Sequence, residues 1–399
     1  MKHYFLILLA LAIMSCTAAP ALKVTITNPL AIDRQHETIE IACSELQQYL
    51  PILENGAYIV YNETGEEIPS QIVYEGMDTP QKLIFQVDIN ANATAQYSII
   101  YQKEKQTDYT AKVYGRFAPE RFDDYFWEND RIAFRIYGLA LIAKDGPSNG
   151  LDVIVKRTDR FFMDKIYKDY TENDISYHID HGEGLDCYKV GRSLGAGAVA
   201  PYINNKLWLG QNFAAYQTLD NGPIRTSVRL DYNEFDVDGQ AVSETRIFSL
   251  DAGAQLNKVT TIFTGFEGIV PVAAGIVLKN RYKPADVDKA DPDHRPVLAP
   301  EKGYIIYSEE GDRAKPEHEN GIVYTAVVFP DALKTAKLDQ QHVLAVTDYQ
   351  AGSELTHYAG AGWSKWGFSS PEEWTAYIDN FAQQLQHPLR IKLEMIKNK

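Results

Sequence analysis

PIRTSVRLDYNEF (223–235), SETRIFSL (243–250) and QLNKVTTIFTG (255–265) are three consecutive stretches in which apolar and polar residues alternate. Such alternation is typical of β-strands, because successive side chains of a strand point to opposite faces of the sheet. Similar runs lie on both sides of these three: RIAFRIYG (131–138), GLDVIVKR (150–157), GIVYTAVVF (321–329) and HVLAVTDYQ (342–350). Residues 108–399 are therefore predicted to form a large sandwich of two packed sheets.

The preceding region, residues 22–107, contains shorter strand-like runs. They are separated by turn-rich pieces such as NETGEE (62–67), and they include LKVTITN (22–28), ETIEIAC (37–43), KLIFQVDI (82–89) and YSIIYQ (97–102). This pattern predicts a small antiparallel β-sandwich. The predicted fold class is mainly β, with a small N-terminal sandwich, a larger one and a helix near the C-terminus.

The C-terminal helix has a clear start. Ser370 is a good N-cap, Pro371 suits the first helical turn, and Glu373 completes a capping box. An apolar stripe follows at helical spacing, formed by Trp374, Tyr377, Ile378, Phe381 and Leu385. We expect this stripe to pack on a sheet.

The first 21 residues are typical of an export signal. Lys2 supplies the positive end, and Phe5–Met14 form an apolar run too short to span a bilayer. Residues 13–16 are similar to a bacterial lipobox, with Cys16 as the lipidated residue. The sequence therefore predicts an exported lipoprotein, anchored to a membrane and facing the periplasm or on the outer membrane.

Composition excludes some functions. A net charge of −15 argues against nucleic acid as a partner, because phosphate binding needs clustered Lys and Arg. It does not exclude an acidic small substrate, since arginines can gather locally in an acidic protein. SLGAGA (193–198) lacks the helix and lysine of a nucleotide-binding loop, and no GxSxG nucleophile elbow is present.

Residues 115–138, GRFAPERFDDYFWENDRIAFRIYG, interleave charged residues with aromatic ones. Arginine can bind a carboxylate or sulfate through two parallel hydrogen bonds. Arg116 and Arg121 lie in a proline-containing loop before the strand, so we expect them to contact an anionic ligand. Glu128 and Asn129 are expected to orient these arginines. Most of the charges in this stretch, which include Asp124 and Arg135, are expected to form ion pairs along a solvated strand edge.

The stretch YHIDHGEGLDCYKVG (177–191) concentrates groups that bind or transfer protons. His178 and His181 cannot face the same side of an extended strand because their spacing is odd, whereas a glycine-containing loop can turn both towards one point. In one hypothesis a histidine is a general acid or base, oriented by a carboxylate. In the others, the histidines and acids brace the loop, or bind a divalent metal, although their spacing matches no ligand motif.

A third polar concentration is HYAGAGWSKWG (357–367). Its glycines allow the backbone to approach a ligand closely, and a tryptophan ring can stack on a sugar. We therefore consider His357, Tyr358, Trp363 and Lys365 as substrate-binding residues. The alternative is a closing turn before the helix, with the tryptophans in the core.

Four segments carry a resemblance to a known family: APERFDDYFWENDRIAFRIYG (118–138), SNGLDVIVKRT (148–158), YHIDHGEGLDCYKVGRSLGAG (177–197) and NGPIRTSVRLDY (221–232). They resemble a family of exported proteins from polysaccharide-degrading bacteria, which includes the ulvan oligosaccharide dehydratase. The resemblance extends over residues 22–390. It implies removal of water across C4 and C5 of a non-reducing-end glucuronate or iduronate linked to rhamnose 3-sulfate. It also implies a downstream glycosidase for the unsaturated product, and a large sandwich similar to those of galactose mutarotases and uronate lyases.

That reaction needs a base at C5, an acid at the departing 4-hydroxyl and a cation at the carboxylate. Proton transfer is expected to fall first on His181, as base or acid, and next on His178 and Tyr188. Asp180 is expected to orient the histidine, and Arg116 and Arg121 to bind the carboxylate. No cofactor and no metal is predicted.

Other functions fit the same residues. A polysaccharide lyase would break a glycosidic bond by the same β-elimination. A non-catalytic glycan-binding lipoprotein would use the aromatic residues and arginines, but would leave the histidines and acids of 177–191 without a purpose. A metal-dependent hydrolase fits them least well.

Overall fold

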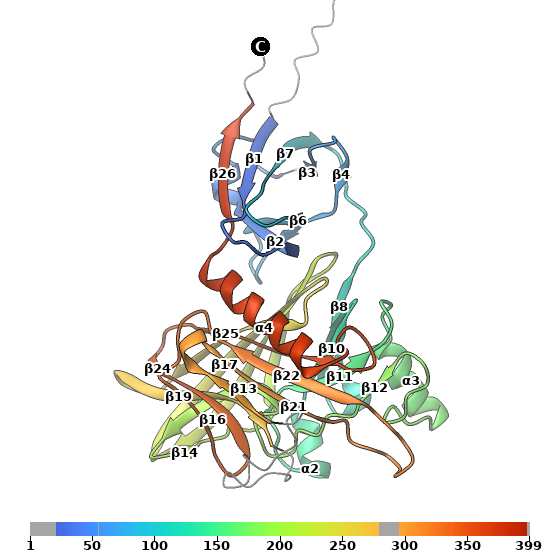
Figure 1. Ribbon diagram of the computed structural model, residues 1–399, viewed down its shortest axis with the longest axis vertical. Helices are drawn as coiled ribbons and strands as arrows, with labels where there is room; N and C mark the ends of the chain where they lie inside the picture. The colour runs from blue at the N-terminus through green and yellow to red at the C-terminus, as the bar shows by residue number, and fades with distance from the viewer. Residues whose placement is uncertain (1–20, 55, 279–294, 397–399) are drawn as a thin grey trace, which may run out of the picture.

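The computed structural model describes residues 21–54, 56–278 and 295–396. The predicted export segment up to residue 20, with the predicted lipidation residue Cys16, lies outside these ranges. The described chain is mainly β, with several antiparallel sheets, a large sandwich and a C-terminal helix, which confirms the predicted fold class. Figure 1 shows the small sandwich above the large one, with helix α4 (Pro371–Gln386) between them. No helix within the described ranges is both long and apolar enough to cross a membrane.

The small sandwich consists of two antiparallel sheets. Its elements are β1 (Ala21–Thr27), β2 (Arg34–Ala42), α1 (Cys43–Leu46), β3 (Gly56–Tyr61), β4 (Glu67–Ile68), β5 (Ser70–Val73), β6 (Lys82–Ile89), β7 (Thr94–Lys103) and β26 (Arg390–Met395). The strand orders are β26-β1-β7-β3-β4 and β2-β6-β5. Alternate side chains of β1 and β6, including Leu22, Val24 and Phe85, fill the core between the sheets.

The last strand, β26, belongs to the small sandwich and not to the large one. It pairs with β1 in antiparallel register, from Leu22 opposite Met395 to Thr27 opposite Arg390, and the two strands lie side by side in Figure 1. Residues 390–395 were predicted, with all others after 107, to belong to the large domain. The chain returns because β1 is otherwise an edge strand, whose free backbone groups accept a further strand.

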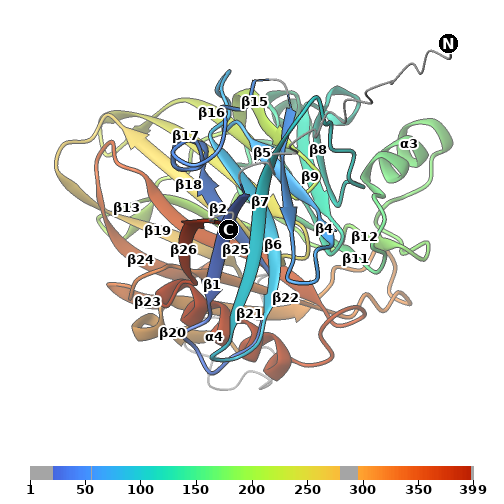
Figure 2. The same cartoon turned by 90° about the horizontal axis from the view of Figure 1, so that it is seen from above.

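The large sandwich contains the remaining elements. They are β8 (Val113–Ala118), β9 (Asp124–Asn129), β10 (Ile132–Ile136), α2 (Ile142–Asp145), β11 (Asp152–Lys156), α3 (Met163–Asn173), β12 (Gly184–Leu185), β13 (Ala196–Ile203), β14 (Lys206–Leu207), β15 (Phe213–Asn221), β16 (Arg225–Val237), β17 (Gln240–Asp251), β18 (Leu256–Thr264), β19 (Ile269–Val277), β20 (Val297–Ala299), β21 (Tyr304–Glu310), β22 (Ile322–Val328), β23 (Thr335–Leu338), β24 (His342–Gln350), β25 (Leu355–Trp363) and α4. An eight-stranded sheet, β15-β16-β17-β18-β25-β22-β21-β20, shares one core with two five-stranded sheets, β12-β11-β10-β9-β8 and β14-β13-β19-β24-β23. Seen from above, α3 lies at the rim of this sandwich (Figure 2).

The stretch from residue 223 to 265 forms the predicted strands β16, β17 and β18. A two-residue turn joins the first two, and its residues Asp238 and Gly239 have φ of 53° and 83°. Positive φ at both central residues defines the hairpin turn that Asp-Gly favours. Along β17, every second side chain from Val242 to Leu250 is buried. The period of two therefore matches the inner and outer faces of the large sheet, although the inner face of β17 also holds the buried ion pair of Glu244 and Arg246.

Helix α4 begins where the capping residues predict. The Ser370 hydroxyl accepts the backbone N–H of Glu373, and the Glu373 carboxylate accepts the backbone N–H of Ser369. Trp374 and Ile378 are fully buried against the outer face of the eight-stranded sheet. The predicted packing of this helix on a sheet is confirmed.

Candidate functional site

Five charged side chains are buried together beside the sheet β12-β11-β10-β9-β8. We call them the Arg135 cluster: Arg121, Asp124, Arg135, Asp152 and Asp186, each less than one-tenth exposed. Arg135 on β10 lies directly opposite Asp152 on β11. Its Nε and Nη2 donate to Asp152 Oδ2 at 2.8 and 2.5 Å, and Nη2 also donates to Asp186 Oδ2 at 2.6 Å. One guanidinium thus holds two carboxylates side by side, as buried charges require.

The second guanidinium of the cluster is only partly satisfied. Arg121 ends a 3₁₀ turn (Pro119–Arg121), and its Nε donates to the Tyr177 hydroxyl at 2.8 Å. Its Nη1 lies 3.7 Å from Asp124 Oδ2, too far for a hydrogen bond. Among the described residues, neither this Nη1 nor Asp124 Oδ1 has a hydrogen-bond partner. A buried polar atom without a partner is unfavourable unless a ligand or water satisfies it.

The cluster retains a proton near neutrality. Burial raises the pKa of Asp124 to about 7, although the charges of Arg135 and Arg121 oppose the rise. Burial also raises the pKa of Asp152, again against Arg135, and the neighbouring Asp186 adds to the rise. Three carboxylates share two guanidinium groups, so the low polarity of the site favours one neutral acid.

His178 is the imidazole at the surface of this cluster. Its side chain is 52% exposed, and its Nδ1 lies 2.9 Å from the Asp186 carbonyl oxygen and 3.8 Å from Asp186 Oδ2. Because a carbonyl oxygen can only accept, Nδ1 carries the proton in the neutral ring and Nε2 keeps the lone pair. Tyr177 links this ring to Arg121, since its own ring centroid lies 4.5 Å from that of His178.

A second buried ion pair fixes the elements around the cluster. Glu128 on β9 accepts the backbone N–H groups of Phe162 and Met163, each at 3.0 Å, at the start of α3. Lys156 on β11 donates to the same carboxylate at 2.6 Å. A carboxylate at a helix N-terminus satisfies free N–H groups and the helix dipole. Helix α3 is thereby held so that Tyr167 donates to Asp124 Oδ2, at 3.4 Å.

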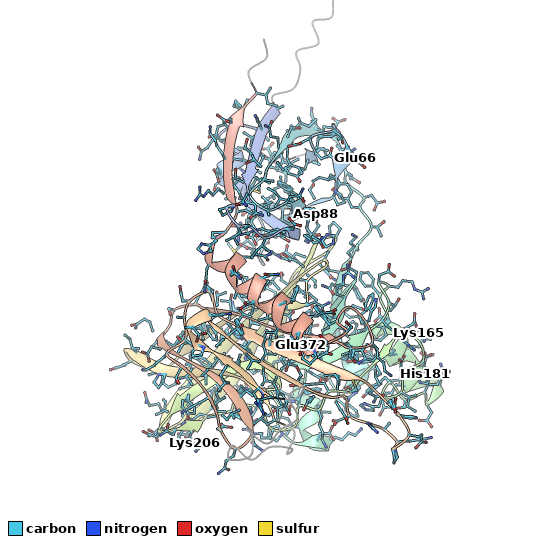
Figure 3. All side chains as sticks on the ribbon, viewed as in Figure 1. Glu66, Asp88, Lys165, His181, Lys206 and Glu372 are labelled. Atoms are coloured by element: carbon cyan, nitrogen blue, oxygen red, sulfur yellow. The ribbon has the colours of Figure 1, made fainter. Side chains whose placement is uncertain are left out.

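Of the other two predicted proton-transfer residues, His181 lies apart from this cluster, whereas Tyr188 lies near enough to Asp152 of the cluster for that charge to contribute to its raised pKa. His181 is exposed, its Nε2 lies 3.0 Å from the Ser176 carbonyl oxygen, and it lines a void of about 20 Å³ beside α3, enough for one water. Figure 3 shows His181 and Lys165 together at the α3 side of the molecule. Tyr188 is buried in the core of the large sandwich, where burial raises its pKa well above the usual value.

Asp180 and Arg116 have local partners. The Asp180 carboxylate accepts the backbone N–H of Gly182 at 2.8 Å and forms an ion pair with Arg157 at 3.0 Å. The Arg116 guanidinium is held by Glu120 at 2.6 Å and Asp164 at 2.7 Å. Of the predicted site residues, the structure therefore brings Arg121 and His178 together.

The predicted sugar-binding residues of 357–365 separate onto two faces of β25. His357 and Trp363 point inward: burial lowers the His357 pKa to about 4, and the Trp363 indole donates to a backbone carbonyl at 2.6 Å. Tyr358 points outward, towards α4, where its ring contacts Phe381 edge-on. Lys365 donates to the Glu319 carbonyl oxygen.

Arg135, Asp124 and Asp152, at the centre of the cluster, were not among the predicted site residues. The expectation that Arg135 and Asp124 lie on a solvated strand edge is wrong, because both are buried. The sequence did contain a signal. Arg135 is the one charged residue of β10, whose other four residues are apolar, and Asp152 is the first residue of the buried strand DVIVK. A charge within a wholly buried strand indicates a specific partner. In the described residues, no three His, Cys, Asp or Glu side chains are grouped to hold a metal ion.

Comparison with known proteins gives matches over most of the chain. "Uncharacterized protein P7" of Formosa agariphila is 30% identical over 388 residues, covering 93% of each chain. An α-mannosidase from Enterococcus faecalis V583 has a TM-score of 0.51 at 11% identity, covering 94% of this chain and 46% of that one. A glycosyl hydrolase family 38 protein from Enterococcus faecalis has a TM-score of 0.49 at 12% identity, covering 94% and 47%.

This chain thus spans less than half the length of the two solved structures, and the likeness to the α-mannosidase is one of fold alone. The family match is more informative, because it covers residues 26–391 and almost all of both sandwiches. The chain belongs to the family described as a domain of unknown function, DUF4861.

Proposed function

We propose that this protein is an oligosaccharide dehydratase that removes water across C4 and C5 of a non-reducing-end uronic acid. The substrate would be glucuronate or iduronate linked to rhamnose 3-sulfate, as in ulvan. The observation that carries the proposal is that Tyr177 contacts both Arg121 and His178. It thereby brings a guanidinium nitrogen without a hydrogen-bond partner among the described residues near an oriented imidazole. Two of the four segments that resemble the ulvan dehydratase family, residues 118–138 and 177–197, contribute all of these residues.

Arg121 is assigned to the substrate carboxylate. The C5 proton is acidic only because the adjacent carboxylate takes up the negative charge as the proton leaves. Arg121 Nη1 has no hydrogen-bond partner among the described residues, and it gains a charge-assisted hydrogen bond when a carboxylate arrives. Arg135 serves a different purpose, because Asp152 and Asp186 already occupy it.

His178 is assigned to proton transfer. Its Nε2 removes the proton from C5, the C5–H electron pair becomes the C4=C5 double bond, and the C4–O bond breaks. The imidazolium then returns that proton to O4, so that water leaves and the ring is again neutral. The Asp186 carbonyl keeps Nδ1 protonated throughout and stabilises the imidazolium. We assign this role to His178, and not to His181, because His181 lies beside α3 and braces its own loop.

The proposal has consequences for cellular context. The unsaturated uronyl end is a substrate for a glycosidase acting next, and an exported, lipid-anchored enzyme would meet oligosaccharides outside the cytoplasm. The polysaccharide lyase and the glycan-binding lipoprotein differ from the dehydratase in their products. The dehydratase releases one water and leaves the chain intact, the lyase gives two shorter products, and the binding protein gives none.

The test uses purified protein with ulvan oligosaccharides, followed by mass spectrometry and by the ultraviolet absorbance of the new double bond. The wild-type protein should give a product lighter by one water. His178→Ala should lower the rate by at least about a hundredfold, and Arg121→Gln should raise KM and lower kcat. His181→Ala is the matched control and should retain most of the rate. Equal losses in both histidine variants would refute the assignment, and chain cleavage would favour the lyase.

A further inference from the structure

A cleft of about 560 Å³ lies between the two sandwiches, apart from the residues assigned to the reaction. Strand β2 of the small sandwich forms one wall, the outer face of β17, β18 and β25 forms another, and α4 forms a third. Figure 1 shows α4 lying between the two bodies at this level. The volume is within the range of small-molecule sites.

The sheet wall presents a polar row that ends in an aromatic ring. Ser249, Lys258 and Tyr358 are direct cross-strand neighbours on β17, β18 and β25, and all three line the cleft. The α4 wall adds Tyr377 and Phe381. Tyrosine offers an apolar ring face and a hydroxyl together, which suits a pyranose with its C–H face and its hydroxyl edge.

Two cations in the cleft, Arg131 and Lys258, have no acidic partner in the part of the chain that the structure describes. Among the described residues, no carboxylate lies within ion-pair distance of Arg131 or Lys258, although both line the cleft. The third cation, Arg225, differs because Glu40 at 2.7 Å and Asp251 at 2.6 Å hold it. In a protein of net charge −15, two unpaired cations beside aromatic rings favour an anionic ligand with apolar faces.

The β2 wall is locally strained. The pairing of β2 with β6 shifts between Arg34 and Glu37, and His36 within this bulge has φ of 54°. A left-handed conformation is costly for a residue with a side chain, and such outliers concentrate at functional positions. Of the acids on this wall, Glu37 is paired with Arg34 at 2.7 Å and Asp33 accepts the Ala91 backbone N–H at 2.8 Å.

From these observations we infer that the cleft is a second glycan-binding site, which holds an acidic oligosaccharide through Arg131, Lys258 and Tyr358. Binding in the cleft requires no reaction, so this inference extends beyond the proposed function. Only the expectation that the ligand carries uronate and sulfate groups rests on that function. Arg131 immediately precedes β10, and Arg135 lies four residues further along. At about 3.3 Å per residue, the two arginines are about 13 Å apart along the strand. Arg131 thus connects the cleft to the strand that carries Arg135, although every residue of that strand is buried.

Calorimetric binding of an ulvan tetrasaccharide tests the inference. The measurements use the His178→Ala background, so that no turnover occurs, and compare it with the same protein carrying Arg131→Gln and Lys258→Gln. Loss of two charge-assisted contacts should weaken binding at least about tenfold. The control protein carries Lys103→Gln and Lys206→Gln, which remove the same charge from exposed positions. Lys206 lies at the far end of the large sandwich (Figure 3), and this control should leave the Kd unchanged. The carboxyl-reduced, desulfated tetrasaccharide should bind the His178→Ala protein no better than it binds the triple variant.

Equal affinity of the two proteins for the acidic tetrasaccharide, or no binding by either, would overturn the inference. Thermal unfolding of each variant verifies that it is folded. A protein with Lys258→Arg in place of Lys258→Gln should regain most of the lost affinity, because arginine keeps the positive charge. The proposed function fails independently, if the wild-type protein removes no water. Binding that depends on Arg131 and Lys258 without any water loss would leave a glycan-binding protein.

Discussion

Replacing Asp124 with asparagine should change how the stability of the protein depends on pH. Asp124 is fully buried in the Arg135 cluster, and the only hydrogen bond of its side chain among the described residues is accepted from the Tyr167 hydroxyl. Asparagine has almost the same shape and can accept that bond through its side-chain oxygen. The substitution therefore removes the titration of this group and leaves the packing nearly unchanged.

The magnitude follows from the raised pKa. The carboxyl has a pKa of about 7 in the folded protein against an ordinary value of 3.8, because burial disfavours the charged form. The folded state therefore binds the proton more tightly than the unfolded chain does. The resulting stabilisation is fully present below 3.8 and is lost as the pH rises through about 7. This separation corresponds to about 4 kcal/mol in total, of which about 3 kcal/mol is lost between pH 5 and pH 8.

Urea unfolding of the wild-type protein, Asp124→Asn and Asp108→Asn across this range measures the effect. Asp108 is an exposed control for removal of one carboxylate. The free energy of unfolding of Asp124→Asn minus that of wild type should increase by about 3 kcal/mol from pH 5 to pH 8, while the Asp108 variant follows wild type. If the difference for Asp124→Asn is as flat as that for Asp108→Asn, Asp124 does not retain its proton and the reasoning is refuted.

Three further predictions concern stability, measured by urea unfolding at neutral pH. Lys156→Met should cost about 3–5 kcal/mol, because Glu128 is left buried without its cation, and adding Glu128→Gln should recover part of the loss; no recovery would contradict the pairing. Trp374→Ala should cost about 3–5 kcal/mol, because this fully buried ring anchors α4 to the large sheet, whereas Gln383→Ala on the exposed face should have little effect. Ser370→Ala should cost about 1 kcal/mol through loss of the N-cap, and an unchanged midpoint would show that the cap is dispensable.

Local patterns were sufficient to predict much of the fold. The alternation in residues 223–265 predicts β16 to β18 because each of these strands has one buried face, and the capping residues predict the start of α4. The pairing of β26 with β1 has no such signal. The side chains of β26 are mostly exposed, so backbone hydrogen bonds determine its place, and these do not depend on the residue types.

The candidate site was harder to predict, because it depends on register and on single backbone angles. Arg135 meets Asp152 only because β10 and β11 pair in one particular register, which the sequence does not specify. The choice between His178 and His181 depends on the turn that follows them. Gly184 there has φ of 134°, and a β-carbon on it would lie 2.1 Å from the Val155 carbonyl oxygen. That close approach to β11 places Asp186, and hence the hydrogen-bond acceptor of His178, where the cluster needs it.

The position of β26 also affects how the protein is made. Ribosomes release the small sandwich first, but its larger sheet lacks an edge strand until residues 390–395 have been synthesised and have reached β1. The first domain to emerge is thus the last to be completed, and a nascent chain stalled after α4 would expose β1 as an open edge prone to association with other chains. The same arrangement places Leu22 opposite Met395, so a short linker between residues 21 and 396 could close the described part of the chain and allow new termini in a surface loop of the large sandwich.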